Sequence, residues 1–188
     1  MRYLFIGAHP DDIELSCGGT ISRMVCEGHS VYLVIMTCSD GRREEEQRKA
    51  TKVSGATKHI ILPYDDGNVN VNVDSIKRIE KIISIVNPDA VFTHYFEDTH
   101  QDHRNTAMIV RSATRMLNGE KHGIIYYKST SSLNFKPNMY VDITKYEENK
   151  RDIIKCFSSQ IDKFNLRGID IIRYELLKNE EYGFEQGV

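Results

Sequence analysis

Apolar and polar positions follow two patterns along the chain, and together they predict strands and helices in alternation. Short runs of apolar and β-branched residues, such as residues 30–37 (SVYLVIMT), have the length and composition of buried strands. Longer stretches repeat apolar residues with mostly helical spacing, as residues 75–86 do with isoleucine at positions 76, 79, 82, 83 and 85. Strands that alternate with helices of this length indicate βαβ units. The pattern therefore predicts a Rossmann-like α/β fold, in which a mostly parallel sheet carries helices on both faces.

The predicted elements cover the chain up to about residue 158. Strands are expected at residues 2–8, 30–37, 59–62, 90–93, 123–128 and 139–142. Helices are expected at residues 20–27, 44–54, 75–86, 104–117 and about 145–158. One hydrophobic core commonly closes at about 100 to 200 residues, so the 188 residues are expected to form a single domain over residues 1–188.

Charge and composition exclude several classes of protein. The 25 Lys and Arg residues are scattered and are matched by 27 Asp and Glu residues, so nucleic acid is not an expected partner. No apolar run approaches the roughly 20 residues needed to span a bilayer, and carboxylates follow the first residues too early for a signal peptide. The four cysteines form no C-x-x-C pair and are expected to be mostly reduced core thiols. These features predict a cytoplasmic protein.

Two polar motifs follow the first and fourth predicted strands. Residues 8–14 (AHPDDIE) place His9 and three carboxylates directly after the first strand. Residues 100–103 (HQDH) follow the fourth strand, with His94 and Asp98 just upstream. Both loops should open on the same edge of the sheet, where parallel α/β sheets bind ligands. Two histidines and one carboxylate can fill three positions of a zinc site and leave the fourth for water, which is the catalytic arrangement.

Each motif alone also has a simpler interpretation. An Asp in a His-Pro-Asp turn is a favoured helix N-cap, and Asp102 at a helix start could complement the helix dipole beside two surface histidines. A purely structural explanation leaves unexplained why both motifs lie at strand ends, where functional residues of such folds gather. We therefore interpret the two motifs as parts of one metal site.

The motifs resemble those of the LmbE-like or PIG-L-like N-acetylglucosaminyl deacetylases, whose marks are an A-H-P-D-D-x-E turn and a later H-x-x-D-H. The likeness covers roughly residues 3–160. It extends to Gly18-Gly19-Thr20, Thr37, Asp40-Gly41, Arg43-x-x-Glu46, Gly55, Asp66-Gly67, Asn134-Phe135-x-Pro137, Val141-Asp142-Ile143-Thr144, Lys150 and Ser159-Gln160.

The resemblance implies a zinc-dependent hydrolase that removes the N-acetyl group from an N-acetylglucosamine-type amino sugar or its glycoside. It implies zinc held by His9, Asp12 and His103. It also implies Asp11 as the general base and His100 beside the scissile carbonyl. This division agrees with chemistry, because zinc lowers the pKa of water to about 7 and a nearby carboxylate can then accept the proton.

Further positions are implied less directly. Asp102 would orient an imidazole as a hydrogen-bond acceptor, and Glu14 would do the same or only interact with the following helix start. Arg43 matches a substrate-binding arginine and Asp66 an acid that contacts sugar hydroxyls, although a charged helix face and a simple turn would also explain them.

The second motif departs from some relatives. They place an aromatic residue two positions before its first histidine, where this chain has Asp98. The chain therefore has no Tyr at this position to stabilise an oxyanion, and Tyr95 is the nearby aromatic residue that could approach instead. Asp98 could instead contact a ligand histidine.

Two alternatives belong to other functional classes. The same two histidines and one carboxylate could bind Fe²⁺ in a non-haem iron oxygenase, but such an enzyme has no use for the free base Asp11, and its usual fold is an all-β barrel. A non-catalytic Rossmann-like ligand-binding domain would need a phosphate loop, and no G-x-G-x-x-G follows the first strand. The identity of the amino sugar and the formation of a homo-oligomer stay open.

Overall fold

The computed structural model describes residues 1–115 and 123–176 of the chain. Its strands are β1 (Arg2–Gly7), β2 (Ser30–Thr37), β3 (Lys58–Tyr64), β4 (Ala90–His94) and β5 (Gly123–Tyr127). Its helices are α1 (Asp12–Cys26), α2 (Gly41–Ser54), α3 (Val73–Val86), α4 (Gln101–Ala113), α5 (Glu147–Lys155) and α6 (Ser158–Leu166), with a 3-10 turn, η1 (Thr144–Tyr146), before α5.

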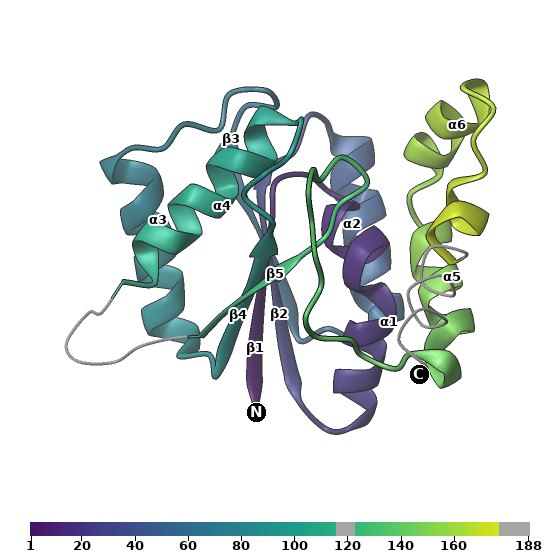
Figure 1. Ribbon diagram of the computed structural model, residues 1–188, viewed down its shortest axis with the longest axis horizontal. Helices are drawn as coiled ribbons and strands as arrows, with labels where there is room; N and C mark the ends of the chain where they lie inside the picture. Colours follow the sequence, from purple (N-terminus) through teal and green to yellow (C-terminus); the bar gives the residue numbers. More distant parts are fainter. Residues whose placement is uncertain (116–122, 177–188) are drawn as a thin grey trace.

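The five strands form one sheet, and every neighbouring pair is parallel, in the order β3-β2-β1-β4-β5. Figure 1 shows α3 and α4 on one side of the sheet and α1 and α2 on the other, with α5 and α6 outside α1 and α2. The predicted α/β fold with helices on both faces is confirmed.

The strand order changes direction at β1. After β1 the chain adds β2 and β3 on one side, and it then returns to place β4 on the other side of β1. In sheets of this kind, the carboxyl ends on either side of such a change leave a crevice where ligands bind. The loops that follow β1 and β4 therefore begin where a site is expected.

The sheet has an apolar core on each face, because alternate residues of a strand point to opposite sides. Leu4 and Ile6 of β1 pack toward α3 and α4, together with Ile79 and Ile109. Phe5 lies on the other face in the cluster that includes residues of α1, and its ring stacks on Phe92 at a centroid distance of 4.2 Å.

The first helix is longer than predicted. It begins at Asp12 and not at Thr20, so Gly18 and Gly19 lie inside it. These glycines allow close approach, because a Cβ added at Gly19 would lie 2.6 Å from a methyl carbon of Ile143. The glycine pair therefore lies within the helix and marks a contact between α1 and a later segment.

The chain after β5 also differs from the prediction. Residues 139–142 were predicted as a strand but form none. The predicted helix at residues 145–158 is divided into η1, α5 and the start of α6. The helix predicted at residues 104–117 begins earlier, at Gln101, and ends at Ala113. Its last two predicted positions lie outside the described residues.

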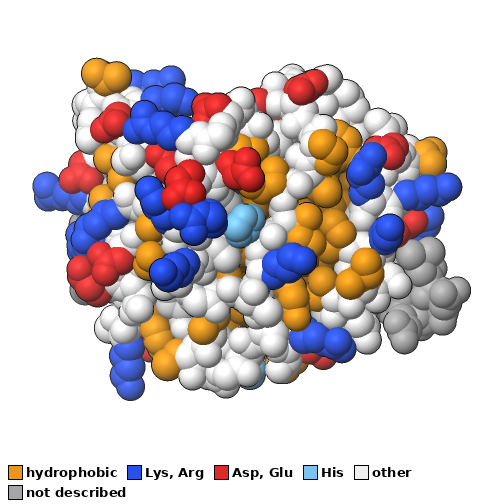
Figure 2. All heavy atoms as spheres, turned by 180° about the vertical axis from the view of Figure 1, so that it is seen from behind, with side chains coloured by type: hydrophobic (Ala, Val, Ile, Leu, Met, Phe, Trp, Pro, Cys, Tyr) orange, Lys and Arg blue, Asp and Glu red, His pale blue; other side chains and the backbone are white. Residues whose placement is uncertain are grey.

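Charged side chains of both signs are interspersed on the face of the molecule shown in Figure 2, and no patch of one sign dominates it. This agrees with the scattered charges in the sequence. Among the described helices, none combines the length and the apolar composition that a membrane span requires.

Candidate metal and catalytic site

The loop after β1 makes a sharp turn that separates two neighbouring carboxylates. Asp11, the residue before α1, has a positive φ of 99°, which residues other than glycine rarely adopt. Its side chain points to Arg43 of α2, with 2.9 Å between Asp11 Oδ1 and the guanidinium. The side chain of Asp12 points instead to a group of histidines. The turn therefore allows adjacent acids to have different functions.

Asp12 lies at the centre of the histidine group. Its Oδ2 is 3.2 Å from His9 Nδ1 and 3.2 Å from His94 Nε2, and its Oδ1 is 3.3 Å from His103 Nε2. Burial raises the pKa of Asp12, but the nearby His103, His94 and His9 lower it by more. The pKa of Asp12 therefore lies well below its usual value. Asp12 is therefore ionised, as a metal ligand must be.

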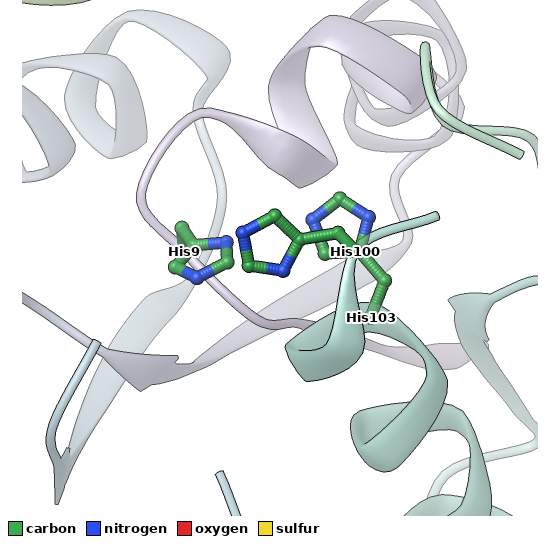
Figure 3. Close-up of side chains that lie close together, drawn as sticks. All are labelled: His9, His100 and His103. Carbon is green, nitrogen blue, oxygen red and sulfur yellow. The ribbon is translucent and has the colours of Figure 1, made fainter. Parts of the chain in front are cut away.

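Figure 3 shows His9 on the loop after β1 and His100 and His103 at the start of α4, with their rings close together. The ring centroids of His9 and His100 are 4.7 Å apart, as are those of His100 and His103. One ligand atom from each of the three histidines lies within 4.8 Å of the others. The two sequence motifs thus meet in one place.

The partners of His9 and His103 fix which ring nitrogen faces Asp12. His9 Nε2 lies 3.1 Å from carboxylate oxygens of both Asp66 and Asp102, so Nε2 carries the proton and Nδ1 is free to bind a metal. His103 Nδ1 lies 3.2 Å from Asp98, which leaves Nε2 free. When a metal is bound, both rings can therefore turn an unprotonated nitrogen toward it beside the Asp12 carboxylate.

Asp12 lies at the spacing of metal donors from His9 and from His103, through a different carboxylate oxygen for each. Among the described residues, the groups whose ligand atoms all lie within 4.8 Å of one another are His9-His100-His103, Asp12-His94-His103 and His9-Asp66-Asp102. Two metal–ligand bonds of about 2.0 to 2.2 Å at a tetrahedral angle place their donor atoms about 3.3 to 3.6 Å apart. The observed distances from the Asp12 oxygens to His9 Nδ1 and His103 Nε2 are 3.2 and 3.3 Å. Burial lowers the pKa of His103, but Asp12 and Asp98 raise it to about 10. The surrounding carboxylates thus create a negative potential that favours a cation at this point.

Two further acids, Asp66 and Asp102, contact Nε2 of His9, on the side of the ring away from Asp12. Asp102 is fully buried, and its carboxylate accepts hydrogen bonds from the backbone N–H groups of Gly67 at 2.7 Å and Val69 at 3.2 Å. Asp66 is more open, with a side chain 42% exposed. Asp102 is therefore placed to orient His9, whereas Asp66 keeps part of its carboxylate accessible to a ligand.

Arg43 is buried, unlike the exposed helix face that a run of charged residues usually forms. It is 7% exposed, and its guanidinium donates to Asp11 and to the backbone carbonyl of Pro10. Burial and the neighbouring Asp12 raise the pKa of Asp11 to about 8, although Arg43 lowers it. The buried Arg43 therefore holds Asp11, the residue that the sequence suggests as the general base.

His100 is half-buried and occupies the N-cap position of α4. Its Nδ1 accepts a hydrogen bond from the backbone N–H of Asp102 at 3.2 Å, so the proton of the neutral ring lies on Nε2. Burial and the neighbouring histidines His103 and His9 lower the pKa of His100. The ring can therefore offer an N–H donor at the site.

No role for His94 or for Gln47 follows from the sequence. His94 is fully buried, stacks on His103 at a centroid distance of 4.0 Å, and has a pKa lowered to about 4 by burial. Gln47 of α2 donates to Glu14 at 2.6 Å, which ties α2 to α1 behind Asp11. The position of His94 at the end of a predicted strand could have indicated that it lies at the site. No pattern in the sequence indicates that Gln47 pairs with Glu14.

Tyr95 lies in an aromatic group next to the loop that carries His100. Its ring centroid is 4.3 Å from that of Phe96 and 5.1 Å from that of Phe135. No hydrogen bond between Tyr95 and the site histidines is found among the described residues. The structure therefore gives no support to Tyr95 as a substitute for the aromatic residue of some relatives.

Comparison with known proteins gives the family. The model of the PIG-L family, described as GlcNAc-PI de-N-acetylase, matches residues 4–114, which include both motifs. This chain belongs to that family. It is 33% identical over 153 residues to the "uncharacterized deacetylase YaiS" of Escherichia coli K12, and the match covers 74% of this chain and 80% of that protein.

Solved structures share the fold. The N,N'-diacetylchitobiose deacetylase of Pyrococcus horikoshii superposes with a TM-score of 0.83 and 25% identity, covering 100% of this chain and 80% of that one. GalB, the 4-carboxy-2-hydroxymuconate hydratase of Pseudomonas putida KT2440, superposes with a TM-score of 0.84 and 18% identity, covering 98% and 87%. Because this fold also carries a hydratase, the reaction must be argued from the site.

Proposed function

We propose that this protein is a zinc-dependent N-deacetylase that acts on N-acetylglucosamine-type amino sugars or their glycosides. The observation that supports this most directly is the meeting of His9 Nδ1, His103 Nε2 and the Asp12 carboxylate, at 3.2 and 3.3 Å, beside a second buried acid. A three-ligand site with a neighbouring base suits hydrolysis. The names of the relatives add the substrate class, since they include deacetylases and one that acts on diacetylchitobiose.

In this proposal, His9, Asp12 and His103 hold the ion. When bound there, zinc would supply Lewis-acid chemistry, polarising the substrate amide carbonyl and making a water molecule more acidic. Asp102 keeps the ring of His9 in place through the 3.1 Å contact between its carboxylate and Nε2.

Asp11 is the proposed general base. It is adjacent to Asp12 but points elsewhere, so it can accept a proton from the attacking water without binding the ion. A divalent cation at the neighbouring donors would favour the ionised form of Asp11, because a nearby positive charge lowers the pKa of a carboxyl group. Arg43 acts in the same direction and fixes Oδ1 at 2.9 Å.

His100 is the proposed partner of the scissile carbonyl. Its Nε2–H group can donate to the oxyanion that forms during attack on an amide. The leaving amine can then receive the proton that Asp11 accepted from the attacking water, so the neutral ring of His100 keeps its own proton. In other enzymes, removal of a single hydrogen-bond donor to the oxyanion lowers the rate by about 10²- to 10³-fold.

Asp66 and Arg43 are the proposed substrate contacts. The accessible carboxylate of Asp66 suits hydrogen bonds to sugar hydroxyl groups. Nε of Arg43 is buried and has no hydrogen-bond partner among the described residues, so the guanidinium retains donor capacity beyond its contacts with Asp11 and Pro10.

The test is acetate release by the purified protein. Metal-free protein would be loaded with Zn²⁺ or Fe²⁺ and incubated with N-acetylglucosamine, N,N'-diacetylchitobiose and simple N-acetylglucosaminides. We expect release of acetate and a free amine in equal amounts with at least one of them, and loss of activity with a chelator. Absence of release from every acetylated amino sugar in both metal forms would refute the proposal, and activity with Fe²⁺ alone would correct the metal.

A further inference from the structure

The carboxylate of Asp98 receives an unusual number of donors. Asp98 is 3% exposed and lies in the loop between β4 and α4. The hydroxyl groups of Ser129 and Ser131 donate to it at 2.5 and 2.6 Å, and the backbone N–H of His100 donates at 2.8 Å. The hydroxyl of Ser132 adds a contact at 3.3 Å. Both oxygens of this buried carboxylate are therefore used within the protein.

Asp98 also contacts the ring of His103, on the side away from Asp12. Its Oδ2 lies 3.2 Å from Nδ1 of His103, while Nε2 of the same ring lies 3.3 Å from Asp12. The two nitrogens of an imidazole point to opposite sides of the ring. Asp98 therefore contacts His103 from the side opposite Asp12.

We propose that Asp98 is a positioning residue for the metal site, and that Ser129 and Ser131 hold it in place. Asp98 keeps the proton of His103 on Nδ1 and fixes the plane of the ring, so that the Nε2 lone pair points toward Asp12. This inference rests on the metal site of the proposed function. It adds that the segment after β5, which supplies none of the proposed ligands, helps to set the affinity for the ion.

The contacts exclude two other functions for Asp98. A residue that binds substrate or donates a proton to it must reach the open side of the site, and Asp98 is buried with both oxygens occupied. If Asp98 only stabilised the fold, its loss would not change the affinity for the metal. The pairing of a ligand histidine with a carboxylate is instead a recurrent way of orienting the ring and raising its basicity, and loss of the partner typically weakens metal binding by about 10- to 100-fold.

The experiment compares zinc affinity in Asp98→Asn and Glu97→Gln. Asn keeps the shape of Asp98 and removes its charge. Glu97 is the adjacent residue and pairs with Asn134 in a hydrogen bond of 3.0 Å, so Glu97→Gln removes the same charge one position away. Affinity would be measured by competition with a chelator, and folding by circular dichroism of each variant.

We expect one zinc ion per wild-type chain, a loss of about 10- to 100-fold in affinity for Asp98→Asn, and little change for Glu97→Gln. The visible spectrum of the cobalt-substituted protein should also shift in Asp98→Asn, because the bond to His103 changes, and a merely structural effect would leave it alone. Wild-type affinity together with an unchanged cobalt spectrum would overturn the inference.

Two further outcomes separate the inference from the proposed function. If wild-type protein binds no metal, the proposed function fails and this inference fails with it. If wild-type binds zinc but Asp98→Asn does not fold, Ser129→Ala decides, because it removes a donor to the carboxylate, whereas Ser131 also lies 3.4 Å from His103 Nδ1. A loss of a few-fold in affinity supports the inference, and unchanged affinity with an unchanged cobalt spectrum refutes it.

Discussion

Asp11 and Asp12 are neighbours in one turn, yet their surroundings differ. Three imidazoles lie close to the carboxylate of Asp12, whereas a guanidinium is the cation next to Asp11. An imidazole can share a metal ion with a carboxylate, but a guanidinium cannot, because it has no lone pair to offer. The local chemistry therefore favours Asp12 as a ligand and leaves Asp11 as a base.

The first prediction concerns Asp11→Asn. The amide keeps the shape of the side chain but cannot accept the proton of the attacking water. We expect kcat to fall by about 10²- to 10⁴-fold while zinc content stays at the wild-type value. Steady-state kinetics and metal analysis of the same preparation check this. Near-normal turnover, or loss of the metal, would remove Asp11 from its proposed role.

The second prediction concerns Arg43→Ala. It removes a charged hydrogen bond to Asp11 and a proposed substrate contact, so we expect a higher KM and also a kcat lowered by about 10- to 100-fold. Zinc content should not change. Arg42→Ala is the matched control, because the Arg42 side chain is 61% exposed and its partners, Glu46 and Asp162, lie away from Asp11. Wild-type kinetics in Arg43→Ala would show that the buried guanidinium contributes nothing to the reaction.

The sequence predicted the residues of the two motifs but not what holds them. His9, Asp12 and His103 belong to local patterns, and the parallel fold explains why two such patterns meet. The contacts of Asp98 with Ser129 and Ser131 join positions more than 30 residues apart. Such pairs leave no periodicity or spacing in one sequence, so they follow only from the packed structure.

At the scale of elements, α1 shows how a local pattern can mislead. Glycine is a poor helix former, and two in succession suggest the end or the start of a helix. In α1 they serve packing, because α5 and the residues just before η1 approach this face closely. Lys150 of α5 lies against Gly18, and Ile143 lies against Gly19. Tertiary contact therefore outweighs helix propensity here.

The third prediction uses this difference between neighbouring glycines. A Cβ at Gly19 would lie 2.6 Å from a methyl carbon of Ile143, whereas a Cβ at Gly18 would lie 3.4 Å from its nearest neighbour, the Lys150 side chain. We expect Gly19→Ala to lower the free energy of unfolding by about 1 to 3 kcal/mol through overpacking. Gly18→Ala should have little effect or stabilise by up to about 1 kcal/mol, because alanine favours the helix. Urea denaturation of both variants measures this.

Equal stability changes in the two variants would contradict the packing explanation. Adding Ile143→Ala to Gly19→Ala should return part of the lost stability, since the shorter side chain removes the close contact. A double variant less stable than the sum of the single changes would point to another cause.

At the scale of the whole molecule, the site joins two parts of the sheet that are distant in sequence. His9 and Asp12 follow β1, and His103 lies in α4 after β4. The loops meet over the point where the strand order changes direction. Several acids also converge there, including Asp66 and Asp102, and a cation among them would be attracted by their charges. An ion at this place would therefore stabilise the fold as well as take part in the reaction.

The fourth prediction follows from this coupling of metal binding to stability. An ion that binds only the folded chain stabilises it by about 2.7 kcal/mol when its free concentration is 100 times its Kd. For a chain of this size, that corresponds to a rise in Tm of roughly 5 to 11 °C. We expect such a rise when Zn²⁺ is added to chelator-treated protein, followed by thermal unfolding.

Asp12→Ala should lose most of this rise in Tm, because the carboxylate between the two histidines is gone. Mg²⁺ should give a much smaller rise, since it prefers oxygen ligands and two of the three donors are imidazoles. A rise of equal size in Asp12→Ala would place the stabilising ion elsewhere on the molecule, and no rise in the wild-type protein would mean that these donors do not bind zinc.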